Sequence, residues 1–135
     1  MKHESFSADC RLIQALVSHS QPVACSEGHT LFNQGETPAG LYILISGEAA
    51  LMMTSHAGQA VMCLQAGSGS LLGLPGVLGN APYTLTAMIR KDSEVRFITR
   101  ENFVQTIQEQ PGLYPSVLEM LATEVRVARQ ALAER

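Results

Sequence analysis

Short apolar runs separated by turn residues fill residues 21–98, and this pattern constrains the fold more than any other feature of the sequence. Glycine, proline, asparagine, aspartate or serine stands in the turns between the runs. A regular series of about eight short strands is typical of a double-sheet jelly roll or barrel. We therefore predict a double-stranded β-helix (jelly roll) over about 21–98, with strands at 23–25, 30–32, 41–45, 48–53, 59–64, 70–72, 84–89 and 94–98.

Stretches with helical spacing flank the predicted roll on both sides. A short stretch after Ser7, a residue type that caps helices, carries one apolar face made of Leu12, Ile13, Leu16 and Val17. After the roll, the pattern predicts a short helix between Thr99 and Pro111 and a long helix from about Pro115 to the end. At roughly 150 residues per domain, we expect 1–135 to form a single, mainly β domain with its C-terminal helices at about 100–135.

The charge balance argues against partners that need a basic surface. The chain has 9 Lys+Arg against 12 Asp+Glu and a net charge of −3, whereas a nucleic-acid surface or a polybasic membrane contact needs an excess of cations. Acidic neighbours interrupt the one basic cluster, which we interpret as a solvated hairpin and helix cap made of Arg90, Lys91, Arg96 and Arg100. The longest uninterrupted apolar runs have five residues, whereas a membrane helix needs about 20. We expect neither DNA nor membrane as a partner.

The cysteines and histidines do not form a chemical site. Three widely spaced cysteines, Cys10, Cys25 and Cys63, make neither a disulfide framework nor a C-x-x-C pair, so we expect reduced and mostly buried thiols in a cytoplasmic protein. The four histidines are scattered without an H-x-H pair, which argues against a cupin-like metalloenzyme, an alternative that a β-roll allows. We expect no catalytic residue, no metal and no cofactor.

The order of the glycines gives the sequence its resemblance to a known family. LFNQGE at 31–36 is followed by LYILISGEA at 41–49 and by GSLLG at 69–73. Gly35, Gly47, Gly69 and Gly73 stand where turns need a positive φ or close backbone packing. Over about 10–132, the chain resembles the cyclic-nucleotide-binding domain, particularly the sensor half of Crp/Fnr-type bacterial regulators. The resemblance implies a role in transcription regulation or signalling and a dimer formed through the long helix; in those regulators a DNA-reading helix-turn-helix follows the point where this chain stops.

The resemblance also implies a ligand segment, which corresponds here to residues 73–84. In the family, backbone N–H groups at the start of a short helix face the cyclic phosphate, a glutamate directly after the glycine takes a ribose hydroxyl, and an arginine nine or ten residues later pairs with the phosphate. In this sequence the glutamate position holds Leu74, and the arginine position falls on Tyr83 or Thr84. The candidate pocket residues are Gly73, Leu74, Pro75, Gly76, Tyr83 and Thr84.

Both charged groups of the family pattern are therefore missing. Each charge-assisted hydrogen bond is worth about 1.5–3 kcal/mol, so the two together account for on the order of a hundred- to ten-thousand-fold in affinity. We expect the domain not to bind cAMP or cGMP in the usual way. Two alternatives follow: a less charged and more apolar effector of unknown identity in the same pocket, or a pocket filled by Leu74, Tyr83 and their neighbours.

The long C-terminal helix carries more apolar surface than one packing partner requires. Spacings of 3, 4, 3 and 4 are those of a coiled-coil seam, and they relate Leu118, Leu121, Val125, Ala128 and Leu132. A second stripe lies beside this seam and contains Val117, Met120, Val127 and Ala131. Together the stripes cover roughly 200° of the helix, so we predict a helix held between its own roll and a second copy of the chain. The alternatives are a monomer whose first helix wraps the long one and, in function, a ligand-free dimerisation module acting on another regulator.

Overall fold

A single antiparallel sheet, curled into a roll, forms most of the structure. The computed structural model describes residues 8–133. Two long strands, β3 and β6, pair along most of their length and form the spine of the roll; β1 and β2 add to β6, and β4 and β5 add to β3. The strand bounds are β1 (Gln21–Val23), β2 (Thr30–Phe32), β3 (Gly40–Thr54), β4 (Ala60–Ala66), β5 (Ser70–Leu72) and β6 (Thr86–Thr99).

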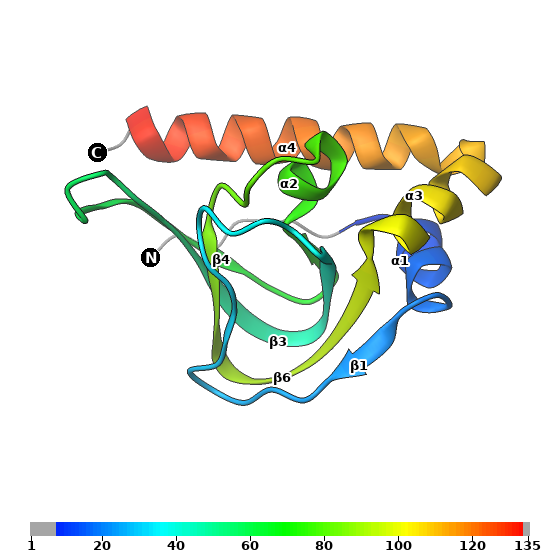
Figure 1. The fold of residues 1–135 in the computed structure, drawn as a ribbon, viewed down its shortest axis with the longest axis horizontal. Coiled ribbons are helices and arrows are strands. Elements are labelled where there is room, and N and C mark those ends of the chain that lie inside the picture. The colour runs from blue at the N-terminus through cyan, green and yellow to red at the C-terminus, as the bar shows by residue number, and fades with distance from the viewer. Residues whose placement is uncertain (1–7, 134–135) are drawn as a thin grey trace.

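The helices gather at one side of this roll. In Figure 1, α4 lies along the top of the molecule, with α2 between it and the sheet and with α3 and α1 on the right, below the first turns of α4. The bounds are α1 (Cys10–Val17), α2 (Leu74–Gly79), α3 (Arg100–Glu109), the 3₁₀ turn η1 (Pro111–Leu113) and α4 (Tyr114–Ala133). This arrangement confirms the predicted class, a mainly β roll between an N-terminal helix and a long C-terminal helix.

Within residues 8–133 the roll has six strands rather than eight. The predicted runs 41–45 and 48–53 are one strand, β3, and the runs 84–89 and 94–98 are one strand, β6. The register between these strands shifts three times between Leu44 and Ala49. Such bulges bend a strand without ending it, so the turn residues at 46–47 and 91–93 curl the sheet instead of separating strands.

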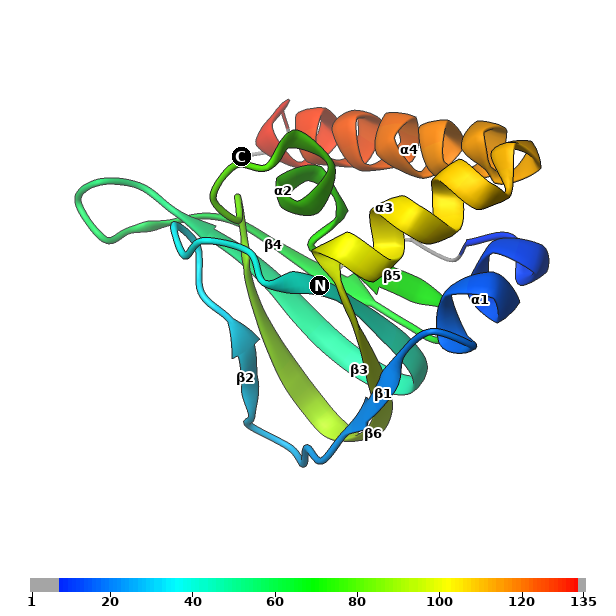
Figure 2. The same ribbon diagram turned by 45° about the vertical axis from the view of Figure 1, so that its right-hand side comes forward.

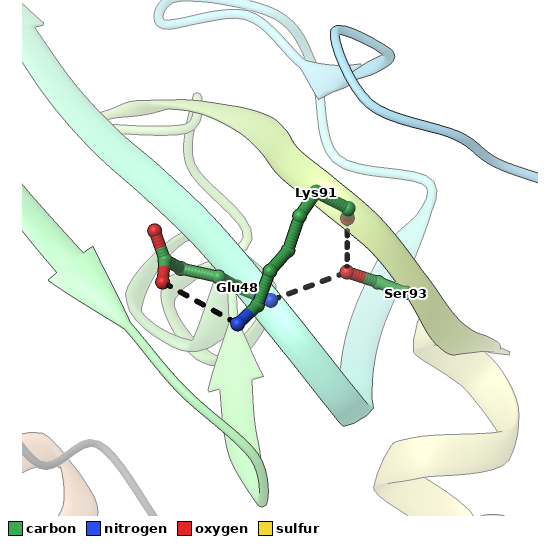
Figure 3. Close-up of polar contacts among 3 residues, drawn as sticks. All are labelled: Glu48, Lys91 and Ser93. Atoms are coloured by element: carbon green, nitrogen blue, oxygen red, sulfur yellow. Dashed lines mark hydrogen bonds and ion pairs between the residues drawn. The ribbon is translucent and has the colours of Figure 1, made fainter.

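Gly47 and Ser93 form the tightest part of this bulge. Gly47 has a φ of 109°, and a Cβ at this position would lie 1.9 Å from the Oγ atom of Ser93. The Ser93 hydroxyl donates a hydrogen bond to the carbonyl of Lys91 at 2.7 Å and accepts one from the backbone N–H of Glu48 at 3.2 Å (Figure 3). The serine side chain thus partners backbone groups where the ladder is interrupted, and only glycine fits beside it.

Side-chain caps begin two of the helices. Asp9 accepts a hydrogen bond from the N–H of Arg11 and caps α1; the predicted cap, Ser7, lies outside the described residues. Thr99 caps α3 by accepting from the N–H of Asn102, as predicted. The α3 face then buries Phe103 completely in the core.

Side chains of the basic cluster bind the chain's own backbone and hydroxyl groups. Arg96 donates to the Oγ and the carbonyl of Ser20, at 2.7 and 2.9 Å. Arg100 donates to the carbonyl of Val77 in α2. Lys91 lies 3.9 Å from the carboxylate of Glu48 (Figure 3). These contacts fit the interpretation of the cluster as a hairpin and helix cap.

The prediction that the thiols are mostly buried was wrong. Cys10 and Cys63 are exposed and Cys25 is half-buried, and all three are free. Cys63 is exposed because successive side chains of β4 point to opposite faces of the sheet and Cys63 lies on the outer face. Cys10 is exposed at the first position of α1. Across residues 8–133 there is neither a cluster of metal-ligating side chains nor a helix long and apolar enough to span a membrane.

Candidate functional site

Gly73 connects β5 to α2 and fixes the geometry of the predicted ligand segment. Its φ is 95°, in the left-handed region that favours glycine. A Cβ at Gly73 would lie 2.7 Å from the Cε1 atom of the Tyr83 ring. Glycine is therefore required twice at this position, by the backbone conformation and by the approach of the aromatic ring.

Leu74, the residue at the family's glutamate position, packs into the core. It is fully buried, and it belongs to the same apolar cluster as Leu41, Leu72 and Val77. Its side chain contributes burial energy to α2, a helix of six residues that could not persist without tertiary packing. The side chain at this position has no polar group to offer a ligand.

Tyr83 is held from several sides. Its ring stacks on Phe32 with centroids 3.9 Å apart, and its hydroxyl donates to the carbonyl of Gly40. Its backbone N–H donates to the carbonyl of Glu36, and its carbonyl accepts from the N–H of Gly35. Burial raises the pKa of Tyr83 to about 12, so the phenol is a neutral donor whose hydrogen is already used inside the protein.

Five of the six predicted pocket residues line one cavity: Gly73, Pro75, Gly76, Tyr83 and Thr84. Leu74 does not line it. The cavity volume is only about 10 Å³, which is room for one water molecule at most. Phe32, Leu51 and Leu71 complete the walls together with Tyr83, so aromatic and aliphatic side chains occupy the space next to Gly73.

Sequence reasoning missed the other six residues of this wall, and the one with a carboxyl group among them is Glu124 of α4. A signal for it was present. The second apolar stripe of the helix, with Met120 and Val127, skips one position in its spacing of 3 and 4, and Glu124 occupies that position. A carboxyl group in the gap of a buried stripe faces the same side as the stripe.

Burial dominates the environment of Glu124. It raises the pKa of this carboxyl group to about 7, because a charged form is disfavoured away from water. Glu124 also borders a second, larger cavity of about 260 Å³ between β4 and α4, lined by Met53, Met62, Leu64, Pro75, Thr84, Leu85, Glu124, Val125 and Ala128.

The two apolar stripes of α4 have opposite exposure. Val117, Met120 and Val127 are buried, and α4 packs on β4 and η1, with α2 next to it in both views (Figures 1 and 2). The residues predicted for dimerisation, which we call the α4 seam, are less covered: Leu118 is 63% exposed, Val125 56% and Leu132 39%, and Leu121 and Ala128 are half-buried.

Comparisons with known proteins agree with this architecture. The sequence model of the cyclic nucleotide-binding domain family matches residues 22–110. The chain is 27% identical over 122 residues to a CRP-like cAMP-activated global transcriptional regulator of Mycobacterium tuberculosis, covering 90% of this chain and 54% of the regulator. The chain thus spans about half the length of the curated relatives that it matches.

Solved structures show the same fold. The catabolite activator protein of Thermus thermophilus superimposes with a TM-score of 0.76 at 25% identity, over 93% of this chain and 59% of that one. The N-terminal domain of a transcriptional regulator from Streptomyces coelicolor superimposes with a TM-score of 0.66 at 22% identity, over 92% of this chain and 89% of that one.

Proposed function

Because this chain belongs to the cyclic nucleotide-binding domain family, we propose that it is a homodimeric sensor domain of Crp/Fnr type that acts in transcription regulation or signalling. Its similarity to a transcriptional regulator of Mycobacterium tuberculosis supports the regulatory role. We further propose that its 73–84 segment does not hold cAMP in the usual way. The observation that carries this second part is the position of Tyr83, stacked on Phe32 beside Gly73.

Charge and volume both support this reading of the 73–84 segment. No cationic side chain lines the cavity beside Gly73 among the described residues, and the carboxyl group of Glu124 borders it. A cyclic phosphate there would meet neither an arginine nor free space, since the cavity holds about 10 Å³. Opening it requires moving Tyr83, which costs a stacked pair and a buried hydrogen bond.

Calorimetric titration with cAMP and cGMP tests this proposal. We expect no binding in the micromolar range, because the loss of two charge-assisted hydrogen bonds weakens binding by on the order of a hundred-fold or more. The cAMP-activated regulator of Mycobacterium tuberculosis is the positive control in the same buffer. A low-micromolar dissociation constant for this chain would overturn the proposal.

The α4 seam supports the dimer. Three large apolar side chains, Leu118, Val125 and Leu132, are exposed on one helix at coiled-coil spacing. Soluble monomers seldom expose a contiguous apolar stripe of this kind. A second copy related by a two-fold axis presents the same stripe and covers it.

Light scattering on the double variant Leu118→Glu/Val125→Glu tests the dimer. One copy has a mass of 14.5 kDa, and we expect the wild-type chain to show twice this mass. The dimer of the variant should have a dissociation constant at least about a hundred-fold higher, because two charges replace apolar contacts at the seam. Gln130→Glu is the matched control: it adds a charge to α4 on the side away from the seam, at 100° per residue, and should leave the mass unchanged. A wild-type mass of one copy at micromolar concentration contradicts the dimer.

The small cavity favours a second candidate, a ligand-free dimerisation module that acts on another regulator. A cavity of about 10 Å³ beside Gly73 leaves no room for an effector there. Thermal unfolding with a nucleotide panel tests this second candidate, since a ligand at 100 times its dissociation constant adds about 2.7 kcal/mol of stability. Stabilisation by one nucleotide would exclude the ligand-free module.

A further inference from the structure

The larger cavity, beside Glu124, differs from the filled pocket at Gly73. It has a volume of about 260 Å³ and lies between the ends of β3 and β4, the segment after α2, and one face of α4. Its walls are mostly apolar, with Met53, Met62, Leu64 and Leu85 among them. Binding sites for drug-sized ligands have roughly 300–1,000 Å³, so this cavity suits a smaller molecule.

Two residues with polar side chains, Glu124 and Thr84, line the cavity among these apolar walls. Among residues 8–133, the Glu124 carboxylate has neither an ion-pair partner nor a hydrogen-bond partner. The α4 cations Arg126 and Arg129 line a different groove on the outer side of the helix. Among the described lining residues, the cavity therefore has one acidic group and no basic one.

We propose that this cavity binds a small apolar organic cation, with its ammonium group against Glu124 and its apolar body against the methionine and leucine side chains. The inference rests on the proposed sensor function, for which it names the chemical class of the effector. Two of the nine lining residues, Pro75 and Thr84, belong to the 73–84 segment, and the cavity shares them with the smaller one beside Gly73.

A cation complements this cavity better than an anion or a neutral molecule. A carboxylate taken out of water is costly unless a partner compensates its charge, and a charge-assisted hydrogen bond in a site of low dielectric is stronger than a neutral one. An anion would add repulsion at the same point. Methionine side chains such as Met53 and Met62 are flexible and polarizable, and they adapt to ligands of irregular shape.

The position of the cavity connects it to the α4 seam. Val125 and Ala128 line the cavity and also belong to the seam, and Val125 is 56% exposed. An occupant would contact both the roll and the face of α4 that meets the second copy. Ligand binding would then change how α4 packs against the roll and the second copy. By linkage, dimerisation would change the affinity for the ligand by the same factor.

The test uses three probes with one ring and different charges: benzylamine, benzyl alcohol and benzoate. Each is titrated at pH 8 into the full chain while amide resonances are followed by NMR. We expect benzylamine to shift resonances of β4, Leu85 and α4 and to bind at least tenfold more tightly than benzyl alcohol, with no binding of benzoate. The variant Glu124→Gln keeps the shape of the side chain, and it should bind benzylamine no more tightly than it binds benzyl alcohol.

A second variant separates a specific site from general attraction. Glu119 is exposed on the same helix and outside the cavity, so Glu119→Gln removes the same charge and should bind benzylamine like the wild type. Equal binding of benzylamine to the wild type and to Glu124→Gln, or no binding to the wild type in the millimolar range, overturns the inference. Such a failure leaves the proposed function standing, because that proposal is tested by cyclic-nucleotide titration and light scattering, which use neither benzylamine nor the Glu124 variant.

Discussion

Replacement of Tyr83 by alanine is expected to lower the free energy of unfolding by about 3–5 kcal/mol, the usual cost of deleting a buried aromatic side chain. The ring is 5% exposed, it stacks on Phe32, and its hydroxyl bonds the carbonyl of Gly40. Whole domains are stable by only about 5–15 kcal/mol, so the change removes a large part of the total. Urea unfolding at one fixed protein concentration measures it.

Two further variants divide the effect of Tyr83 into its parts. Tyr83→Phe keeps the stacked ring and loses the hydrogen bond to Gly40, so it should cost about 1 kcal/mol. Thr84→Ala changes the exposed neighbour and should stay within about 0.5 kcal/mol of the wild type. A loss below about 1 kcal/mol for Tyr83→Ala would mean that the ring does not fill the space next to Gly73.

Glu124→Gln is expected to stabilise the fold at pH 8 by about 2 kcal/mol and to leave it unchanged near pH 4. Burial raises the pKa of Glu124 from 4.5 to about 7, so the folded protein binds this proton more tightly than the unfolded chain does. Each tenfold change in proton affinity corresponds to about 1.4 kcal/mol, so the full pKa difference corresponds to about 3 kcal/mol. We expect about 2 kcal/mol instead, because Glu124 is only half-buried and water screens part of the effect.

The sign of this pH dependence follows from the two pKa values. Below pH 4.5 the carboxyl group is protonated in both states, and the stabilising effect of the folded state's higher proton affinity is fully present. It is lost as the pH rises to about 7, because the folded state must then give up the proton or hold a buried charge. Urea unfolding of wild type and variant between pH 4 and 8 gives the difference.

Glu119→Gln, on the exposed side of α4, serves as the control for Glu124. Its unfolding free energy should stay within about 0.5 kcal/mol of the wild type at each pH, because substitutions at exposed positions usually have effects of this size. All three proteins are compared at one concentration, since dimerisation adds to apparent stability. A Glu124→Gln profile parallel to that of the wild type would contradict a higher proton affinity of Glu124 in the folded state.

The sequence predicted the elements of the fold better than their number. The glycines at 35, 47 and 73 were predicted to stand at turns that need a positive φ, and all three have one. The separation of runs into eight strands was wrong in detail because a turn signal at 46–47 also suits a bulge. The choice between a strand end and a bulge depends on the partner strand: Ser93 satisfies the backbone of Glu48 across the sheet, and local sequence does not encode that contact.

The candidate site could be predicted only in part. The pattern at 73–84 located Gly73 and Tyr83, and these two residues do meet in the fold. It did not indicate Glu124, which is 41 positions beyond Tyr83 and becomes a neighbour of Pro75 and Thr84 only when α4 crosses the roll. The gap in the buried stripe of α4 was a visible signal, but a charged residue in a helix is most often solvated.

By itself, the sequence determined the mainly β architecture, the position of the flanking helices and the absence of both charged groups at Leu74 and Tyr83. These are properties of local periodicity, turn chemistry and residue identity. The tertiary structure decided that Tyr83 fills the space beside Gly73 and that the carboxyl group of Glu124 borders an apolar cavity. The physical reason is that burial, cavity volume and proton affinity depend on neighbours that are distant in the chain, and only packing brings those neighbours together.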